Sequence, residues 1–178
     1  SCPTETLRAL AAARITHVVG IPDNTSAPLF DALGDHPSIT LVTATREGEA
    51  IAVAAGLWLG GAAPLIVIQN TGLLESGDSL RGTASRMGAA VPMLITGRGY
   101  AKMAKAGITP DEPRTRAFLT RPDVDTTAPL TEPTLDAWGI PFERCEEEEY
   151  AAATILRAIE SARTEERPTA AIIACPLN

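Results

Sequence analysis

The sequence predicts an α/β fold, in which a single doubly wound, mostly parallel six-stranded sheet carries helices on both faces. Six short apolar runs, typical of buried parallel strands, alternate along the chain with stretches of helical pattern. No hairpin turn signal separates two consecutive runs. The composition agrees, because 178 residues with 45% apolar and 21% charged side chains suit one domain with a sizeable core. We therefore expect residues 1–178 to form one domain.

The first part of the chain is expected to contain two helices and two strands. In chain order, the pattern predicts a helix at residues 4–13, a strand at 16–21, a helix that ends near 33 and a strand at 39–42. Polar side chains at 24–26 supply N-terminal caps for the second helix, and Gly34 is expected to end it.

The next stretch, residues 50–74, contains no charged side chain and is long enough to suggest a membrane span. Two glycines and a proline interrupt it, and its composition changes from alanine-rich to β-branched. We predict instead a helix at 47–59 followed by a strand at 65–69. Because this helix is almost wholly apolar, we expect most of its sides to be buried, either within the domain or under a partner.

A proline-rich stretch divides the second part of the chain. Residues 97–133 show neither the helical nor the strand period of apolar residues, and they include five prolines. We therefore expect an irregular loop there, on the ligand-binding side of the domain. Four consecutive glutamates, residues 146–149, are expected to open the last helix, where negative charge stabilises the helix dipole. The remaining predicted elements are a helix at 72–87, a strand at 91–96, a helix at 134–138, a strand at 140–143, a helix at 147–163 and a strand at 169–174.

Composition also excludes several classes of function. With 22 acidic and 15 basic residues the formal net charge is −7, which disfavours a nucleic-acid or membrane-surface partner. The three cysteines are widely spaced and there are two histidines, so we expect neither a disulfide framework nor a metal site in this chain. The start of the chain shows no export signal, and we expect a cytoplasmic, reducing location.

Ligands of open parallel sheets bind at the carboxyl ends of the strands, which directs attention to the residues that follow each strand. No Gly-x-Gly-x-x-Gly follows the first strand, and the phosphate-loop and nucleophile-elbow motifs are missing, so dinucleotide and hydrolase functions are disfavoured. Glu47 is more informative because it opens an apolar helix, where a buried carboxylate is unfavourable without a partner. The alternative is a solvated acid at a helix N-terminus.

Several motifs together resemble the pyrimidine-binding domain of thiamine-diphosphate enzymes, most closely that of the phosphonopyruvate decarboxylases and the α subunit of sulfopyruvate decarboxylase. The resemblance covers nearly the whole chain. It is carried by residues 20–23 (GIPD), 45–50 (TREGEA), 54–56 (AAG), 69–73 (QNTGL), 98–99 (RG), 111–113 (DEP) and 135–141 (LDAWGIP).

The resemblance implies a role for one acid. Glu47 matches the glutamate that hydrogen-bonds N1′ of the cofactor's aminopyrimidine, and for this it must be protonated or share a proton with N1′. Glu49 is the competing acid, but two residues along a helix turn the side chain by about 200°, so both cannot face one pocket, and we prefer Glu47. The resemblance also implies cofactor contacts from Pro22, Asn70 and Gly72.

Three further residues are candidates for binding the substrate, a small 2-oxo acid. Asp23 and Asn24 follow the first strand, with turn formation and helix capping as the alternative. Arg98 matches the family's Arg-Gly and suits an anionic group, with an ordinary surface arginine as the alternative. The chain departs from the related decarboxylases at residues 72–75, where Gly-Leu-Leu-Glu replaces the usual Gly-Leu-Gly-Asn. Bulk and charge therefore replace a flexible residue and an amide.

The other half of a thiamine-diphosphate site is missing from the sequence. The Gly-Asp-Gly motif with a downstream Asn, which holds the diphosphate through Mg²⁺, does not occur. The resemblance therefore implies an α subunit of a split 2-oxo acid decarboxylase of the sulfopyruvate or phosphonopyruvate type. A separate β subunit would hold the diphosphate and Mg²⁺, with at least two copies of each chain and homodimerisation of this one. The alternatives are a carboligase, a decarboxylase of another 2-oxo acid, and a non-catalytic binding or regulatory module.

Overall fold

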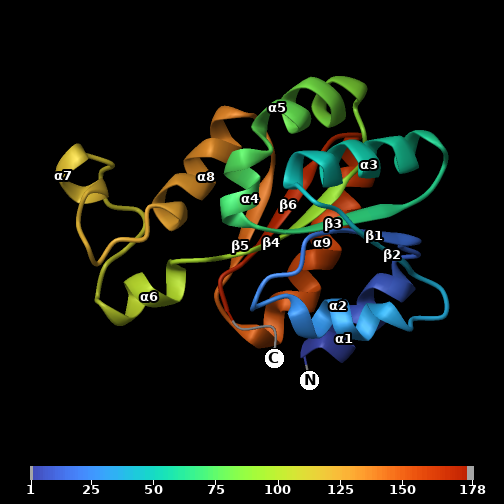
Figure 1. The fold of residues 1–178 in the computed structure, drawn as a ribbon, viewed down its shortest axis with the longest axis horizontal. Helices are drawn as coiled ribbons and strands as arrows, with labels where there is room; N and C mark the ends of the chain where they lie inside the picture. The colour runs from blue at the N-terminus through green and yellow to red at the C-terminus, as the bar shows by residue number, and fades with distance from the viewer. Residues whose placement is uncertain (1, 176–178) are drawn as a thin grey trace.

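The computed structural model describes residues 2–175 and contains one six-stranded sheet (Figure 1). The strand order is β2-β1-β3-β4-β6-β5, and every neighbouring pair is parallel. The predicted fold class is therefore confirmed, with a sheet that is wholly rather than mostly parallel. The strands are β1 (His17–Gly20), β2 (Thr40–Thr43), β3 (Pro64–Gln69), β4 (Pro92–Thr96), β5 (Phe142–Cys145) and β6 (Thr169–Ile173).

Helices cover both faces of the sheet (Figure 1). One face packs against α1 (Cys2–Ala12), α2 (Ala27–Gly34) and α9 (Ala151–Glu165). The other face packs against a longer series of helices, which are α3 (Glu47–Leu59), α4 (Asn70–Glu75), the π-helix η1 (Leu80–Ser85) and α8 (Thr127–Ala137). The two layers bury the sheet on both sides, as expected for parallel strands.

Side chains along β3 show how the sheet separates two cores. Leu65 and Val67 pack into the core under α1, α2 and α9, whereas Ile66 and Ile68 pack into the core under α3 and α8. All four are at most 1% exposed, and burial of such a side chain contributes roughly 1.5–3 kcal/mol. The continuous apolar run that identified this strand is thus explained by burial on both faces.

The prediction of a single helix at residues 72–87 is wrong. The chain there forms α4, the short turn α5 (Gly77–Ser79) and then η1. The break follows Ser76, whose hydroxyl donates to the Leu73 carbonyl oxygen. At Gly77 an added Cβ would lie 2.7 Å from Cζ2 of Trp138, so the missing side chain lets α8 and its C-terminal tryptophan approach closely.

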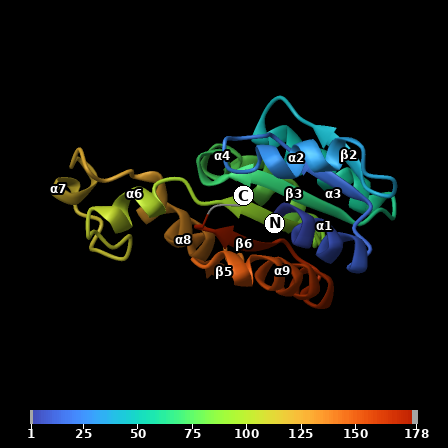
Figure 2. The ribbon, with the colours of Figure 1, turned by 90° about the horizontal axis from the view of Figure 1, so that it is seen from below.

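The stretch at 97–133 is more ordered than its prolines suggest. It contains α6 (Tyr100–Lys105), α7 (Arg116–Leu119) and the first part of α8, which begins well before the predicted start at 134. Figure 2 shows α6 and α7 projecting away from the sheet. This projection has buried apolar contacts of its own, made by Met103, Ile108, Phe118 and Val124. The irregular structure is therefore confined to the connections between these helices.

Two smaller expectations also need correction. The four glutamates precede α9, because residues 148–150 form a separate 3-10 turn, η2 (Glu148–Tyr150). Ser26 occupies the N-cap of α2 but its side chain makes no capping bond. Within the domain, helix α3 is buried on one side: Ala50, Ile51, Ala54 and Ala55 are fully buried, while Ala52, Gly56 and Leu59 are exposed. Burial of its other side under a partner stays a prediction. Within residues 2–175, no helix is long and apolar enough to cross a membrane.

Candidate functional site

The candidate site lies at the carboxyl edge of the sheet, beside β1, β2 and β3. The chain runs from β1 to β2 on one side and returns to β3 on the other, which makes a topological switch point between β1 and β3. Ligands of doubly wound sheets gather at such a point. Helix α3 starts here after β2, and α4 starts here directly after β3.

Glu47 and Gly72 are in direct contact at this edge. Glu47 is the first residue of α3, and its side chain lies against the bare Cα of Gly72 in α4. A Cβ added to Gly72 would lie 2.1 Å from Cγ and 2.4 Å from Oε1 of Glu47. Only glycine allows this approach, so the structure brings together two residues that the sequence proposed for cofactor binding.

The two candidate acids of α3 have different surroundings. Glu49 is exposed, and its Oε2 accepts hydrogen bonds from the backbone N–H and the hydroxyl of Thr45, at 2.8 and 2.7 Å. These bonds lower the pKa of Glu49 below its usual range. Glu47 is half-buried, and no residue that the structure describes donates a hydrogen bond to its carboxylate. Glu47 is thus the acid with free capacity for a ligand.

Asn70 links the ends of two strands. Its side chain is fully buried, and Nδ2 donates to the Arg98 carbonyl oxygen at 3.0 Å and to the Thr131 hydroxyl at 3.1 Å. Its Oδ1 accepts from the Arg98 backbone N–H at 3.0 Å. Both amide donors are therefore engaged within the domain, and the geometry gives Asn70 a part in holding α4 and the Arg98 loop in place.

Substituting Asn70 by alanine is expected to destabilise the domain by about 1–3 kcal/mol, because the Arg98 backbone N–H and C=O each lose a partner in a partly buried place. Chemical denaturation of the purified protein measures this free energy of unfolding. Asn24→Ala is the matched control, since Asn24 is exposed. Equal stability of the two variants would show that the hydrogen bonds between the Asn70 side chain and the Arg98 backbone contribute little to the free energy of unfolding.

Asp23 forms the turn after β1. Its Oδ1 accepts from the backbone N–H groups of Thr25 and Ser26, at 2.6 and 3.1 Å, and its Oδ2 accepts from the Thr96 hydroxyl at 2.6 Å. Turn formation, the alternative considered for Asp23, therefore occurs. Thr96 was not singled out from the sequence, although a polar residue at the end of the apolar strand β4 is a usable signal.

The other predicted residues lie around this turn and the Arg98 loop. Pro22 and Asn24 are exposed beside Asp23. The Arg98 side chain is 58% exposed, and its Nε donates to Asp125 Oδ2 at 3.2 Å. Burial alone would raise the pKa of Asp125, but hydrogen bonds from Thr127 and Arg98 outweigh it and lower the pKa. The guanidinium of Arg98 thus pairs with Asp125, which lies where the chain returns from the α6–α7 projection to α8.

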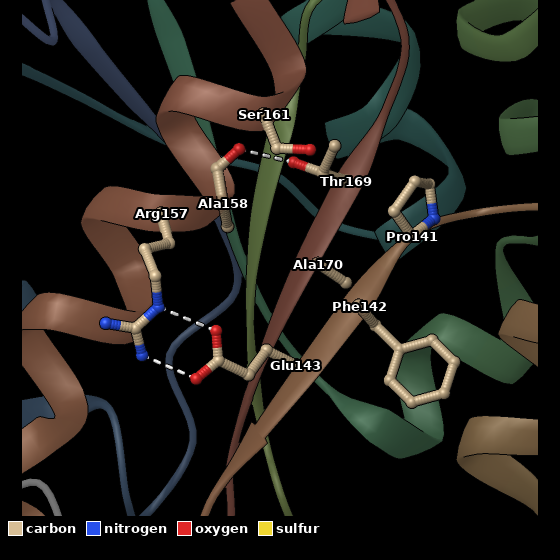
Figure 3. Close-up of a pocket in the computed structure, with 8 residues that line it drawn as sticks. All are labelled: Pro141, Phe142, Glu143, Arg157, Ala158, Ser161, Thr169 and Ala170. Atoms are coloured by element: carbon tan, nitrogen blue, oxygen red, sulfur yellow. Dashed lines mark hydrogen bonds and ion pairs between the residues drawn. The ribbon is translucent and has the colours of Figure 1, made fainter.

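The surface has one groove near the predicted site residues and a smaller cavity away from them. A groove of about 540 Å³ lies at the first turn of α3, and it is lined by Thr45, Arg46, Gly48, Glu49, Ala52, Glu75, Asp78 and Ser79 but not by Glu47. A smaller cavity of about 140 Å³ lies between β5, β6 and α9, near the bidentate Arg157–Glu143 pair (Figure 3). It contains none of the predicted site residues. In the part of the chain that the structure describes, no cluster of three or more side chains could hold a metal ion.

The fold and the site define a class of protein: a doubly wound α/β domain that presents the Glu47 carboxyl group at the switch point of its sheet. The comparisons then identify the family. Residues 5–112 match the thiamine pyrophosphate enzyme, N-terminal TPP binding domain, and the chain belongs to that family. Thiamine pyrophosphate is the same compound as thiamine diphosphate, so the sequence resemblance is confirmed at this level.

Two curated relatives carry the name phosphonopyruvate decarboxylase. The one from Streptomyces viridochromogenes is 44% identical over 59 residues, which is 33% of this chain and 15% of the relative. The one from Streptomyces hygroscopicus is 39% identical over 70 residues, which is 39% of this chain and 18% of the relative. The chain therefore matches less than a fifth of the length of either relative.

Solved structures agree on the fold. A thiamine diphosphate-dependent 4-hydroxybenzoylformate decarboxylase from Rhodococcus jostii superposes with a TM-score of 0.61 at 18% identity, and benzoylformate decarboxylase from Polynucleobacter necessarius with 0.67 at 18%. Each alignment covers 99% of this chain and 30% of the other. At this identity the likeness establishes the architecture alone.

Proposed function

We propose that this chain is the pyrimidine-binding α subunit of a split thiamine-diphosphate-dependent 2-oxo acid decarboxylase, in which Glu47 activates the cofactor's aminopyrimidine. The observation that carries the proposal is the Glu47 carboxylate, which lies at the switch point and rests on the bare Cα of Gly72. It receives no hydrogen bond from any other described residue. A ring nitrogen of the cofactor needs a hydrogen-bond partner that is not already engaged and that is held on a rigid element, and the Glu47 carboxyl group meets both conditions.

The residues present fit the cofactor that the family implies. Glu47 begins α3, whose first residues are held by hydrogen bonds, so its backbone is fixed. A proton on the Glu47 carboxyl group can be donated to N1′ and taken back, which is general acid–base work. Thiamine diphosphate, when bound, supplies a thiazolium ring that accepts the electron pair released when carbon dioxide leaves a 2-oxo acid. Pro22 and Gly72 would flank the pyrimidine, and Asn70 would act by holding the Arg98 loop.

The proposed substrate class is a pyruvate that carries a second anionic group, a sulfonate or a phosphonate. The names of the two Streptomyces relatives support this class. Arg98 is the residue we propose for the second anion, because only its Nε is engaged, by Asp125, and the side chain is more than half exposed. Asn24 is exposed in the turn that Asp23 organises, and we propose that this turn borders the substrate.

We further propose that a β subunit supplies the diphosphate-binding domain and holds Mg²⁺. The alignments with the solved enzymes cover 30% of the length of each enzyme. This supports a site to which residues outside the matched domain also contribute. Pairing of two copies of this chain is proposed along the exposed side of α3, where Ala52, Gly56 and Leu59 leave apolar surface and Leu59 is 71% exposed. A cytoplasmic location stays a proposal based on the spacing of the three cysteines.

Calorimetric titration tests the shared site. Thiamine diphosphate with Mg²⁺ is titrated into the purified full protein alone, and into its mixture with a candidate subunit that carries Gly-Asp-Gly and a downstream Asn. Binding is expected only in the mixture, since each chain contributes half of the contacts. Tight binding to the single protein would contradict a split site. Absence of binding in both titrations would favour the non-catalytic module.

A further inference from the structure

A carboxylate from α4 holds the beginning of α3 on both sides of Glu47. Oε1 of Glu75 accepts a hydrogen bond from Nη2 of Arg46, the N-cap residue of α3, and the two side chains form an ion pair. Oε2 of the same carboxylate accepts from the backbone N–H of Gly48 at 3.1 Å. The bond from Arg46, followed by that from Gly48, lowers the pKa of Glu75. Glu75 therefore caps α3 as a charged group.

The same short helix contacts three consecutive residues at the start of α3, the N-cap and the first two residues of the helix. Glu75 bonds Arg46 and Gly48, and Gly72, one turn earlier in α4, lies beneath the Glu47 side chain. Helix α4 is in turn tied to the end of β4 through Asn70. Backbone position and side-chain direction of Glu47 are thus both set from α4.

Leu74 and Glu75 are the two positions at which the sequence departs from the decarboxylases it resembles, and the resemblance implies an asparagine in the place of Glu75. An amide at this place is shorter by one methylene and carries no charge, so it cannot reproduce the ion pair with Arg46. The exchange of amide for carboxylate thus coincides with a specific set of contacts in this structure.

We propose that Glu75 is a positioning residue for Glu47, which fixes the carboxyl group against the cofactor by clamping the first turn of α3. The inference rests on the proposed function for its catalytic part, whereas the clamp itself is independent of that function. Glu75 touches neither cofactor nor substrate in this proposal. Its effect must therefore pass entirely through Glu47.

The clamp is tested first by amide hydrogen exchange of the full protein without cofactor. Glu75→Leu removes both contacts and is expected to speed exchange of the Gly48 N–H about tenfold, while Glu75→Gln keeps an oxygen acceptor and is expected to have a smaller effect. Asp78→Asn is the matched control, because Asp78 is an acid of the same groove that pairs with Arg81 instead. Unchanged exchange of the Gly48 N–H in Glu75→Leu would overturn the clamp, whatever the function.

The positioning role is tested in the assembled enzyme, with turnover expressed per cofactor-binding site. Glu75→Leu is expected to lower kcat about tenfold with KM for the 2-oxo acid within about twofold, and Glu75→Gln is expected to recover part of the loss. In a Glu47→Gln background the same Glu75→Leu change is expected to cause no further loss, since both act through one group.

The outcomes separate the two proposals. An additive loss in the double variant, or an unchanged kcat in Glu75→Leu, would overturn the positioning role while leaving the proposed function intact. Normal turnover by Glu47→Gln would overturn the proposed function itself. Loss of fold is recognised separately, because it lowers the number of cofactor sites rather than the turnover of each site.

Discussion

Replacing Glu47 by glutamine is expected to reduce decarboxylation by the assembled enzyme about 10²–10⁴-fold, the range that general acid–base catalysis contributes. The amide keeps the shape and the contact with Gly72, so the domain is expected to fold and to join its partner normally. What it lacks is a proton that can move to and from N1′ of the pyrimidine. Single-turnover measurement of carbon dioxide release gives the rate of the chemical step directly.

Glu49→Gln is the control for this experiment. Glu49 lies two residues further along α3, is exposed and bonds Thr45, so its substitution is expected to change turnover by less than about twofold. If Glu47→Gln retains normal decarboxylation, the proposed mechanism is wrong. If Glu49→Gln shows the larger loss, the wrong acid of the pair has been assigned.

Substituting Gly72 by alanine is expected to lower turnover about 10²-fold through displacement of Glu47. The new methyl group would lie 2.1 Å from Cγ of Glu47, and Asn70 and Leu73 hold α4 through fully buried side chains, so the glutamate side chain must rotate to another rotamer. Because the half-buried Glu47 side chain has room to move, the melting temperature is expected to change little. Steady-state kinetics and thermal unfolding of the same samples check both statements.

A matched glycine is available in the same run of helices. Gly82 lies in η1, and a Cβ there would have only Asp78 Oδ1 nearby, at 4.0 Å. Gly82→Ala is therefore expected to leave turnover unchanged. Equal activity of the two alanine variants would show that close contact with Gly72 does not determine where the Glu47 carboxyl group lies.

Hydrophobic pattern was sufficient for the framework of the fold. The strands were predicted to within a few residues, because a parallel strand buried on both faces must be apolar along its length, as Leu65 to Ile68 are. Prolines misled the prediction of α8: Pro129 falls in the first turn, where a missing N–H is tolerated, and Pro133, after which the helix was expected to begin, lies inside it. The break between α4 and α5 was missed because it depends on packing of Gly77 against Trp138, far away in the sequence.

The sequence by itself determined the parallel sheet, the edge at which a ligand would bind and the choice of Glu47 as the acid to examine, because these depend on local pattern and motif. Only the tertiary structure decided what the neighbouring polar groups do. Asp23 and Asn70 are engaged by the backbone of the domain, and Glu75 clamps the helix that carries Glu47. Each of these contacts except the Asp23 turn joins residues far apart in the chain, and spacing along a sequence does not reveal which distant groups will satisfy one another.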